Sequence, residues 1–114
     1  MHEMSLAQQV LAIADEAARD AGAKQVLRVR VGVGWLLQVE EQSLSFYLEA
    51  MRRDYPLLGD AAFDLIPEPV RVRCSACGEE TTQDGWGFQC GACGGTDVRV
   101  ISGDRLEVQD MEVL

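Results

Sequence analysis

The chain has 114 residues, of which 47% are hydrophobic and 25% are charged, and its 10 basic and 19 acidic side chains give a formal net charge of −9. This apolar content excludes a disordered chain, and the length allows one compact domain or a small core with an appended segment. The acidic balance argues against a nucleic-acid partner, because such proteins concentrate Lys and Arg to displace counterions from phosphates.

No segment reaches the ~18 consecutive apolar residues that a membrane-spanning helix needs. The first residues also lack the basic region and the apolar run of a signal peptide. We therefore expect a cytoplasmic protein with no membrane partner, whose acidic surface suits a cationic or protein partner.

The first predicted element is an amphipathic helix over residues 5–21. Ser5 and Gln8 form a capping-box pattern, and apolar residues then recur at helical spacing. Gly22 suits the left-handed position that follows a helix. Apolar residues alternate over residues 27–33, which predicts a half-buried strand.

Helical spacing returns after Gly34 and continues to Tyr55, where Pro56 stops the second helix. Residues 62–66 then predict a short strand. Two prolines follow this strand, and they place a domain boundary near Pro69.

The segment 71–101 has a different composition, rich in Cys, Gly and small polar residues, with too few aliphatic side chains to bury a core. After Gly103 apolar residues alternate again and change phase near Asp110, which predicts a final strand with a bulge. This strand needs a partner, and the sheet of the first domain is the available one. We therefore expect a domain of residues 1–70 and 102–114 with residues 71–101 inserted in it.

Two C-x-x-C pairs, separated by twelve residues, contain all four cysteines of the chain: Cys74, Cys77, Cys90 and Cys93. Four thiolates at this spacing are typical of a structural, tetrahedral zinc site, which leaves no open position for catalysis. A Gly after each pair allows the sharp turn that aims amide groups at the sulfurs. Disulfides are disfavoured in a reducing cytosol, and a thioredoxin-like site needs a single pair at the start of a helix.

The N-terminus offers a second group of candidate ligands. A histidine near a chain end is most simply a solvated residue. His2, however, stands beside the α-amine of Met1 and the carboxylate of Glu3. An amine, a backbone amide and an imidazole can chelate one ion, and planar nitrogen-rich coordination favours Ni²⁺ or Cu²⁺ over zinc.

Several motifs together resemble the HypA/HybF family of accessory proteins that deliver nickel for [NiFe]-hydrogenase maturation. They are the opening Met1-His2-Glu3-Met4-Ser5, the segment Val31-Gly32-Val33-Gly34 leading to Val39-Glu40, the paired C-x-x-C motifs, and the closing Gly103-Asp104-Arg105-Leu106-Glu107-Val108 with Met111-Glu112-Val113. The resemblance covers essentially the whole chain. Its most specific feature is the M-H-E start combined with the distant four-cysteine pattern.

The resemblance implies an α+β fold, with two helices on a small mixed sheet and an inserted four-cysteine domain like a zinc ribbon. It implies nickel ligands at Met1, His2 and Glu3, and an acidic residue after the Gly-x-Gly, here Glu40, can join them. Glu40 has a second interpretation as a first-turn carboxylate that complements a helix dipole. The implied zinc ligands are the four cysteines.

The sequence departs from the family pattern at Trp35-Leu36-Leu37. We expect Trp35 to be buried under the second helix, and contact with a partner is the alternative interpretation.

The function we predict is that of a nickel metallochaperone and not an enzyme, with structural Zn²⁺ and transient Ni²⁺ cargo. The resemblance implies a maturation GTPase and a hydrogenase large subunit as partners, and the client enzyme stays open, urease included. An inserted domain also permits a domain-swapped homodimer. The alternative function is a zinc-ribbon module in a nucleic-acid or transcription complex. Such a module needs a basic surface, and residues 71–101 carry 3 basic and 4 acidic side chains.

Overall fold

The structure is a computed structural model, and it describes residues 3–114. Its helices are α1 (Glu3–Asp20) and α2 (Glu41–Met51), with short 3₁₀ turns at Trp35–Leu37, Arg52–Asp54 and Pro56–Leu58. Its strands are β1 (Val26–Gly34), β2 (Ala62–Glu68), β3 (Arg71–Cys74), β4 (Glu80–Thr82), β5 (Val98–Ser102) and β6 (Leu106–Val113). Within the described residues, no helix is both long and apolar enough to cross a membrane.

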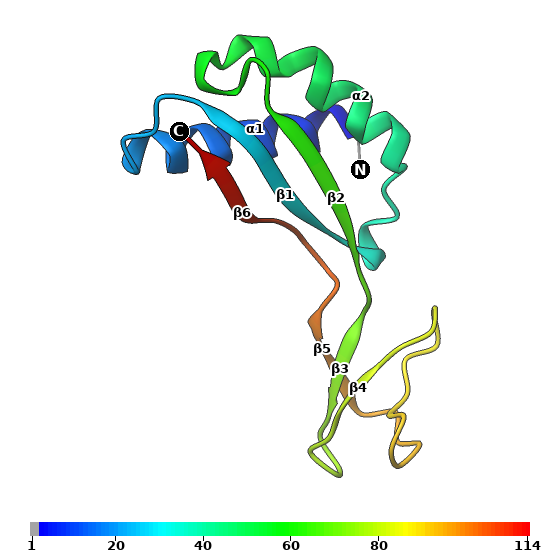
Figure 1. Ribbon diagram of the computed structural model, residues 1–114. Helices are drawn as coiled ribbons and strands as arrows, with labels where there is room; N and C mark the ends of the chain where they lie inside the picture. The colour runs from blue at the N-terminus through cyan, green and yellow to red at the C-terminus, as the bar shows by residue number, and fades with distance from the viewer. Residues whose placement is uncertain (1–2) are drawn as a thin grey trace. The chain divides into compact units, whose positions relative to one another are not determined.

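The chain divides into two compact units (Figure 1). The helical unit consists of residues 3–32, 39–66 and 106–114. The cysteine unit consists of Val33–Gln38 and Pro67–Arg105.

The helical unit contains a three-stranded sheet with the order β2-β1-β6 (Figure 1). β1 and β2 run in the same direction, and β6 runs in the opposite direction (Figure 1). The amide of Leu114, just after β6, bonds to the carbonyl of Gln25, just before β1. The final strand therefore pairs with the sheet of the first domain, as predicted. The expected two helices with a small mixed sheet are confirmed.

α1 packs against α2 and β6, and it buries one apolar face. The buried side chains of the helices and β1 in this unit are Leu6, Ala7, Val10, Leu11, Ala14, Ala18, Val26, Val29, Val31, Leu44 and Leu48. The opposite face of β1 carries Arg28 and Arg30. Arg28 pairs with Asp64 of β2 at 2.7 Å, and Arg30 pairs with Asp110 of β6 at 2.5 Å. The sheet thus has one apolar face and one face of charged cross-strand pairs.

The sequence predicted the C-terminal end of α1 correctly and its N-terminal end incorrectly. Gly22 has a φ of +71°, and the amides of Gly22 and Ala23 bond to the carbonyls of Arg19 and Ala18, as in a Schellman cap. The expected helix stop is therefore confirmed. The expected cap at Ser5 is wrong, because Ser5 already lies within the first turn of α1.

The cysteine unit is built on a second sheet, with the antiparallel order β4-β3-β5. β3 lies in the middle, where Val72 is fully buried between Thr81 of β4 and Val100 of β5. This strand ends at Cys74, so the central strand positions the first cysteine of the cluster.

Candidate metal centre

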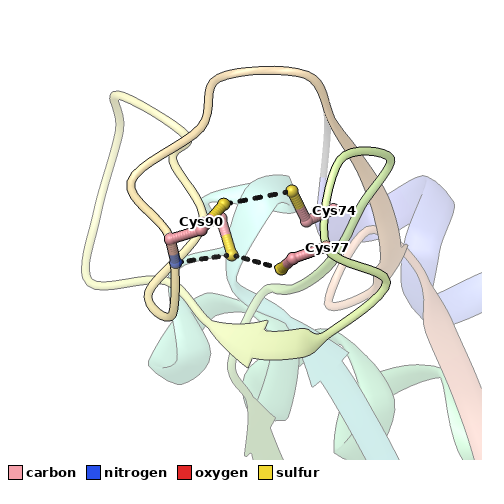
Figure 2. A group of neighbouring side chains, drawn as sticks. Cys74, Cys77 and Cys90 are labelled. Carbon is pink, nitrogen blue, oxygen red and sulfur yellow. Dashed lines mark hydrogen bonds between the residues drawn. The ribbon is translucent and has the colours of Figure 1, made fainter.

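The four cysteines of the cysteine unit lie close together, and Figure 2 shows Cys74, Cys77 and Cys90 of this cluster. Their Sγ atoms all lie within 4.8 Å of one another, and the Cys74–Cys93 and Cys77–Cys90 pairs are each 3.6 Å apart. A tetrahedral ion with Zn–S bonds of ~2.3 Å separates its sulfurs by about 3.8 Å. The cluster therefore has dimensions close to those of a four-thiolate metal site.

The two C-x-x-C segments have the same backbone geometry. In each, the Gly after the second cysteine has a left-handed φ, +79° at Gly78 and +78° at Gly94. The amides of these glycines bond to the carbonyls of Cys74 and Cys90, both at 2.9 Å. The sharp turns predicted from the two glycines are confirmed, since this φ is one that other residues rarely adopt.

Backbone amides point at the sulfurs of the second segment. Cys90 Sγ accepts from the amides of Ala92 and Cys93, and Cys93 Sγ accepts from the amide of Gly95, all at 3.4 Å. The amides of Cys93 and Ala92 lower the pKa of Cys90 to about 6. Such donors stabilise a thiolate, which is the form that binds a metal.

Cys77 behaves differently from Cys90. The amide of Glu79 favours its thiolate, but hydrogen bonding with the other three cysteines, Cys90 first among them, outweighs that effect and raises the pKa of Cys77 to about 12. Four thiols this close together cannot all ionise without a cation between them. The close approach of the four sulfurs makes the cluster a candidate cation site, and the amides directed at Cys90 favour its thiolate.

Burial divides the cluster in two. Cys74 and Cys90 are 1% and 3% exposed, whereas Cys77 and Cys93 are exposed to solvent. The first cysteine of each pair thus faces the interior of the unit and the second faces outward. An ion held here would be closed by four sulfurs, with no position left for a reacting water.

Three polar side chains hold the second C-x-x-C segment, and sequence reasoning missed all of them. The Gln83 side chain donates to the carbonyl of Gln89 and accepts from its amide, at 2.5 and 2.9 Å. The Gln89 side chain donates to the carbonyl of Gly94 at 2.9 Å, and Thr81 Oγ1 accepts from the amide of Gly91 at 3.1 Å. Isolated glutamines in a Gly-rich segment carry no periodic signal that could have identified them.

The segment Val33–Gln38 belongs to the cysteine unit, and backbone contacts fix it there. The amide of Gly34 bonds to the carbonyl of Arg105, and the amide of Leu36 bonds to that of Gly103, both at 3.0 Å. A Cβ on Gly34 would lie 2.5 Å from the Gly103 carbonyl oxygen. Only glycine allows the two backbones to approach this closely.

Trp35 is not buried under the second helix, and that prediction is wrong. Its ring lies 4.7 Å from the ring of Trp86, between centroids, and Trp86 in turn lies 6.3 Å from Phe88. Trp35 is 36% exposed and Trp86 is 64% exposed. Because the 3₁₀ turn at Trp35–Leu37 is fixed against Gly103, Trp35 stacks on the loop between the two cysteine pairs and not on a helix.

Three of the four arginines of the cysteine unit bond to side chains within that unit. Arg71 donates to Thr82, Arg73 pairs with Glu80, and Arg105 pairs with Asp104. Arg73 and Arg105 are paired with carboxylates, so their charges offer little to a phosphate backbone. This arrangement disfavours the alternative of a nucleic-acid module.

The candidate nickel ligands fall partly outside the described residues, because Met1 and His2 precede them. Glu3 lies in the first turn of α1, and its Oε2 accepts from the amide of Glu40 at 3.4 Å. Glu40 is the N-cap of α2. Hydrogen bonds from the amides of Ser43 and Gln42 lower the pKa of its carboxyl. The structure therefore brings Glu3 and Glu40 together although 36 residues separate them.

Comparison with known proteins identifies the family. The family described as "Hydrogenase/urease nickel incorporation, metallochaperone, hypA" matches residues 1–113. Proteins named hydrogenase maturation factor HypA are 35% identical in Paracoccus denitrificans and 38% identical in Geobacter metallireducens, over 99–100% of both chains. The solution structure of the nickel metallochaperone HypA from Helicobacter pylori superposes with a TM-score of 0.79 at 24% identity, covering 100% of this chain and 98% of that one. The chain belongs to the HypA family of nickel metallochaperones of hydrogenase maturation.

Proposed function

We propose that this protein binds Ni²⁺ near its N-terminus and delivers it for [NiFe]-hydrogenase maturation. The observation that carries the proposal is the match of residues 1–113 to the nickel-incorporation family. The protein acts by ligand exchange and performs no catalysis. An incompletely saturated N/O site can release its ion directly to a tighter acceptor.

The nickel ligands in this proposal are the Met1 amine, His2 and Glu3. Imidazole and amine nitrogens suit Ni²⁺ in planar or tetragonal geometry, and a carboxylate oxygen can complete the set. Glu3 is included because it follows His2 directly in the sequence. Glu40, the acidic residue that the family resemblance adds to this group, contacts Glu3 through its backbone amide.

The resident metal in this proposal is Zn²⁺, held by Cys74, Cys77, Cys90 and Cys93. The sulfur separations fit such an ion, and four thiolates select a soft or borderline metal over a hard one. When bound, the ion supplies cross-linking and no reaction step. Residues 71–101 then form the zinc domain, inserted into a nickel-binding domain of residues 1–70 and 102–114.

The partners in this proposal are a maturation GTPase and the hydrogenase large subunit, met in the cytoplasm. The net charge of −9 supports protein partners over nucleic acid. Because the final strand of the helical unit follows the cysteine unit in the chain, strand exchange between two copies is a route to a homodimer.

The test is a calorimetric titration of nickel into zinc-loaded wild type, His2→Ala and Ser5→Ala, with zinc content measured in each. We expect one Ni²⁺ per chain in wild type and Ser5→Ala, and no stoichiometric binding in His2→Ala, with zinc unchanged throughout. An added N-terminal residue that displaces the Met1 amine should also weaken binding. Equal nickel binding by His2→Ala and wild type would refute the N-terminal site.

A further inference from the structure

The carboxylate of Glu40 is directed at the start of α2. Its Oε1 accepts from the amide of Gln42 at 3.2 Å, and its Oε2 accepts from the amide of Ser43 at 2.9 Å. These are amides of the first helical turn, which have no partner within the helix. Both oxygens of Glu40 are thus engaged in capping α2.

The backbone of the same residue is directed at α1. The amide of Glu40 donates to Oε2 of Glu3, so one residue joins the N-termini of both helices. A carboxylate has about four lone-pair sites on its two oxygens. The bond from the Glu40 amide uses one of these sites, so the Glu3 carboxylate can keep this bond and bind a metal at the same time.

We infer that Glu40 is a positioning residue for the nickel site and not one of its ligands: it caps α2, and its amide orients the Glu3 carboxylate. This inference rests on the proposed nickel function. It assigns the two acidic residues different roles, although the family resemblance groups them together as ligands.

The energetic argument concerns what ligation by Glu40 would displace. Turning its carboxylate toward an ion would remove the acceptors of the Gln42 and Ser43 amides, at the first turn of a helix with 11 residues. The bond that Glu3 makes in the described residues, from the Glu40 amide, can persist while its carboxylate binds an ion. Coordination through Glu3 with Glu40 left in place is therefore the arrangement that keeps every observed hydrogen bond.

The experiment uses two substitutions of Glu40 to distinguish its role as a helix cap from a role as an anionic nickel ligand. Glu40→Asn retains a side-chain oxygen that suits an N-cap but has no anionic group to bind nickel, whereas Glu40→Ala loses both. We expect nickel affinity in Glu40→Asn within about twofold of wild type, and in Glu40→Ala lower by about fivefold, the equivalent of a typical cap. The visible spectrum of bound nickel should be the same in Glu40→Asn and wild type, because the ligand set is unchanged.

A control separates positioning from general weakening of α2. Ala50 is exposed near the other end of α2, and Ala50→Gly lowers helix stability by about 1 kcal/mol, or fivefold, without touching the cap. Its nickel affinity should equal that of wild type. Amide hydrogen exchange at Gln42 and Ser43 should accelerate in Glu40→Ala and stay near the wild-type rate in Glu40→Asn.

Two outcomes would overturn the inference. If Glu40→Asn binds nickel as weakly as Glu40→Ala and changes the spectrum, Glu40 is a ligand. If Glu40→Ala binds as tightly as wild type, Glu40 has no role in the site. Failure of the proposed function gives a different result, in which His2→Ala binds nickel as well as wild type.

Discussion

In the described part of the chain, 13 of the 18 buried apolar side chains belong to the helical unit and five belong to the cysteine unit. Two of those five are Cys74 and Cys90. The cysteine unit nevertheless contains 45 residues, Val33–Gln38 and Pro67–Arg105, in a defined fold with its own sheet. A core this small does not offset the conformational entropy of that many residues.

The difference shows where each unit derives its stability. The helical unit buries aliphatic side chains between helices and sheet, which is enough for a small domain. The cysteine unit depends on directed interactions: backbone hydrogen bonds, close approaches at glycine, and the sulfur cluster. We therefore expect metal binding to be part of folding for the cysteine unit and separate from folding for the helical unit.

Metal removal should produce the largest difference in stability between the two units. We expect zinc loss, by chelation or by Cys74→Ala, to unfold the cysteine unit, with a loss on the order of 10 kcal/mol of metal-binding free energy. The helical unit should keep its structure. Amide hydrogen exchange resolved by segment measures both effects, and Ser75→Ala is the control at the adjacent exposed position. If the amides of Val72 and Val100 were equally protected from exchange with and without metal, the expected unfolding of the cysteine unit would be contradicted.

A cavity in the helical unit should lower the stability of that unit and leave the cysteine unit unchanged. Leu11 is fully buried in α1, and Leu11→Ala should lower the free energy of unfolding of this unit by about 2–5 kcal/mol. Zinc content should stay at one per chain, because the sulfur cluster lies in the other unit. Denaturant unfolding followed by helical circular dichroism measures the first effect, and elemental analysis measures the second. Zinc loss in Leu11→Ala would show that the units do not fold separately.

Two glycine substitutions, one in each unit, should differ in their effect on stability because the two sites differ in the space available for a Cβ. Gly22 and Gly103 both have a left-handed φ, +71° and +86°, so Ala at either costs about 1–2 kcal/mol in backbone conformation. A Cβ at Gly22 meets nothing within 4 Å, whereas at Gly103 it would lie 2.5 Å from the carbonyl oxygen of Pro69.

We therefore expect Gly103→Ala to destabilise the protein by roughly 1–3 kcal/mol more than Gly22→Ala, the cost of forcing packed groups apart. Its effect should appear in the cysteine unit, and that of Gly22→Ala in the helical unit. Thermal unfolding of the two zinc-loaded variants gives the comparison. Equal losses would mean that the backbones at Gly34, Gly103 and Pro69 are not packed in solution as they are here.

Sequence patterns predicted the helical unit well and the cysteine unit only in part. Helical and alternating periods located both helices, β1 and β6, because one face of each of these elements is less exposed than the other. The C-x-x-C spacing predicted the sulfur cluster. Periodicity did not indicate β4, which has three polar residues and is stabilised by its register with β3.

The segment Val33–Gln38 illustrates a second limit. Its position depends on contacts with Arg105 and Gly103, some 70 residues later, and on the stacking of Trp35 on Trp86. A local pattern contains no information about such pairing. The proximity of Glu3 and Glu40 has the same character, because it depends on how α1 and α2 pack.

The smallest expected effect is the response of the Glu40 cap to pH. Hydrogen bonds from the amides of Ser43 and Gln42 hold the pKa of this carboxyl below its ordinary value of 4.5. The cap's contribution is therefore full above that value and is lost as the pH falls through the lower pKa of the folded protein. A carboxyl ¹³C titration by NMR should give a midpoint below 4.5, with the amide shifts of Gln42 and Ser43 following it. In Glu40→Asn those two amide shifts should lose this transition. A Glu40 midpoint at or above 4.5 would show that the cap does not form in solution, and it would remove the support for a positioning role.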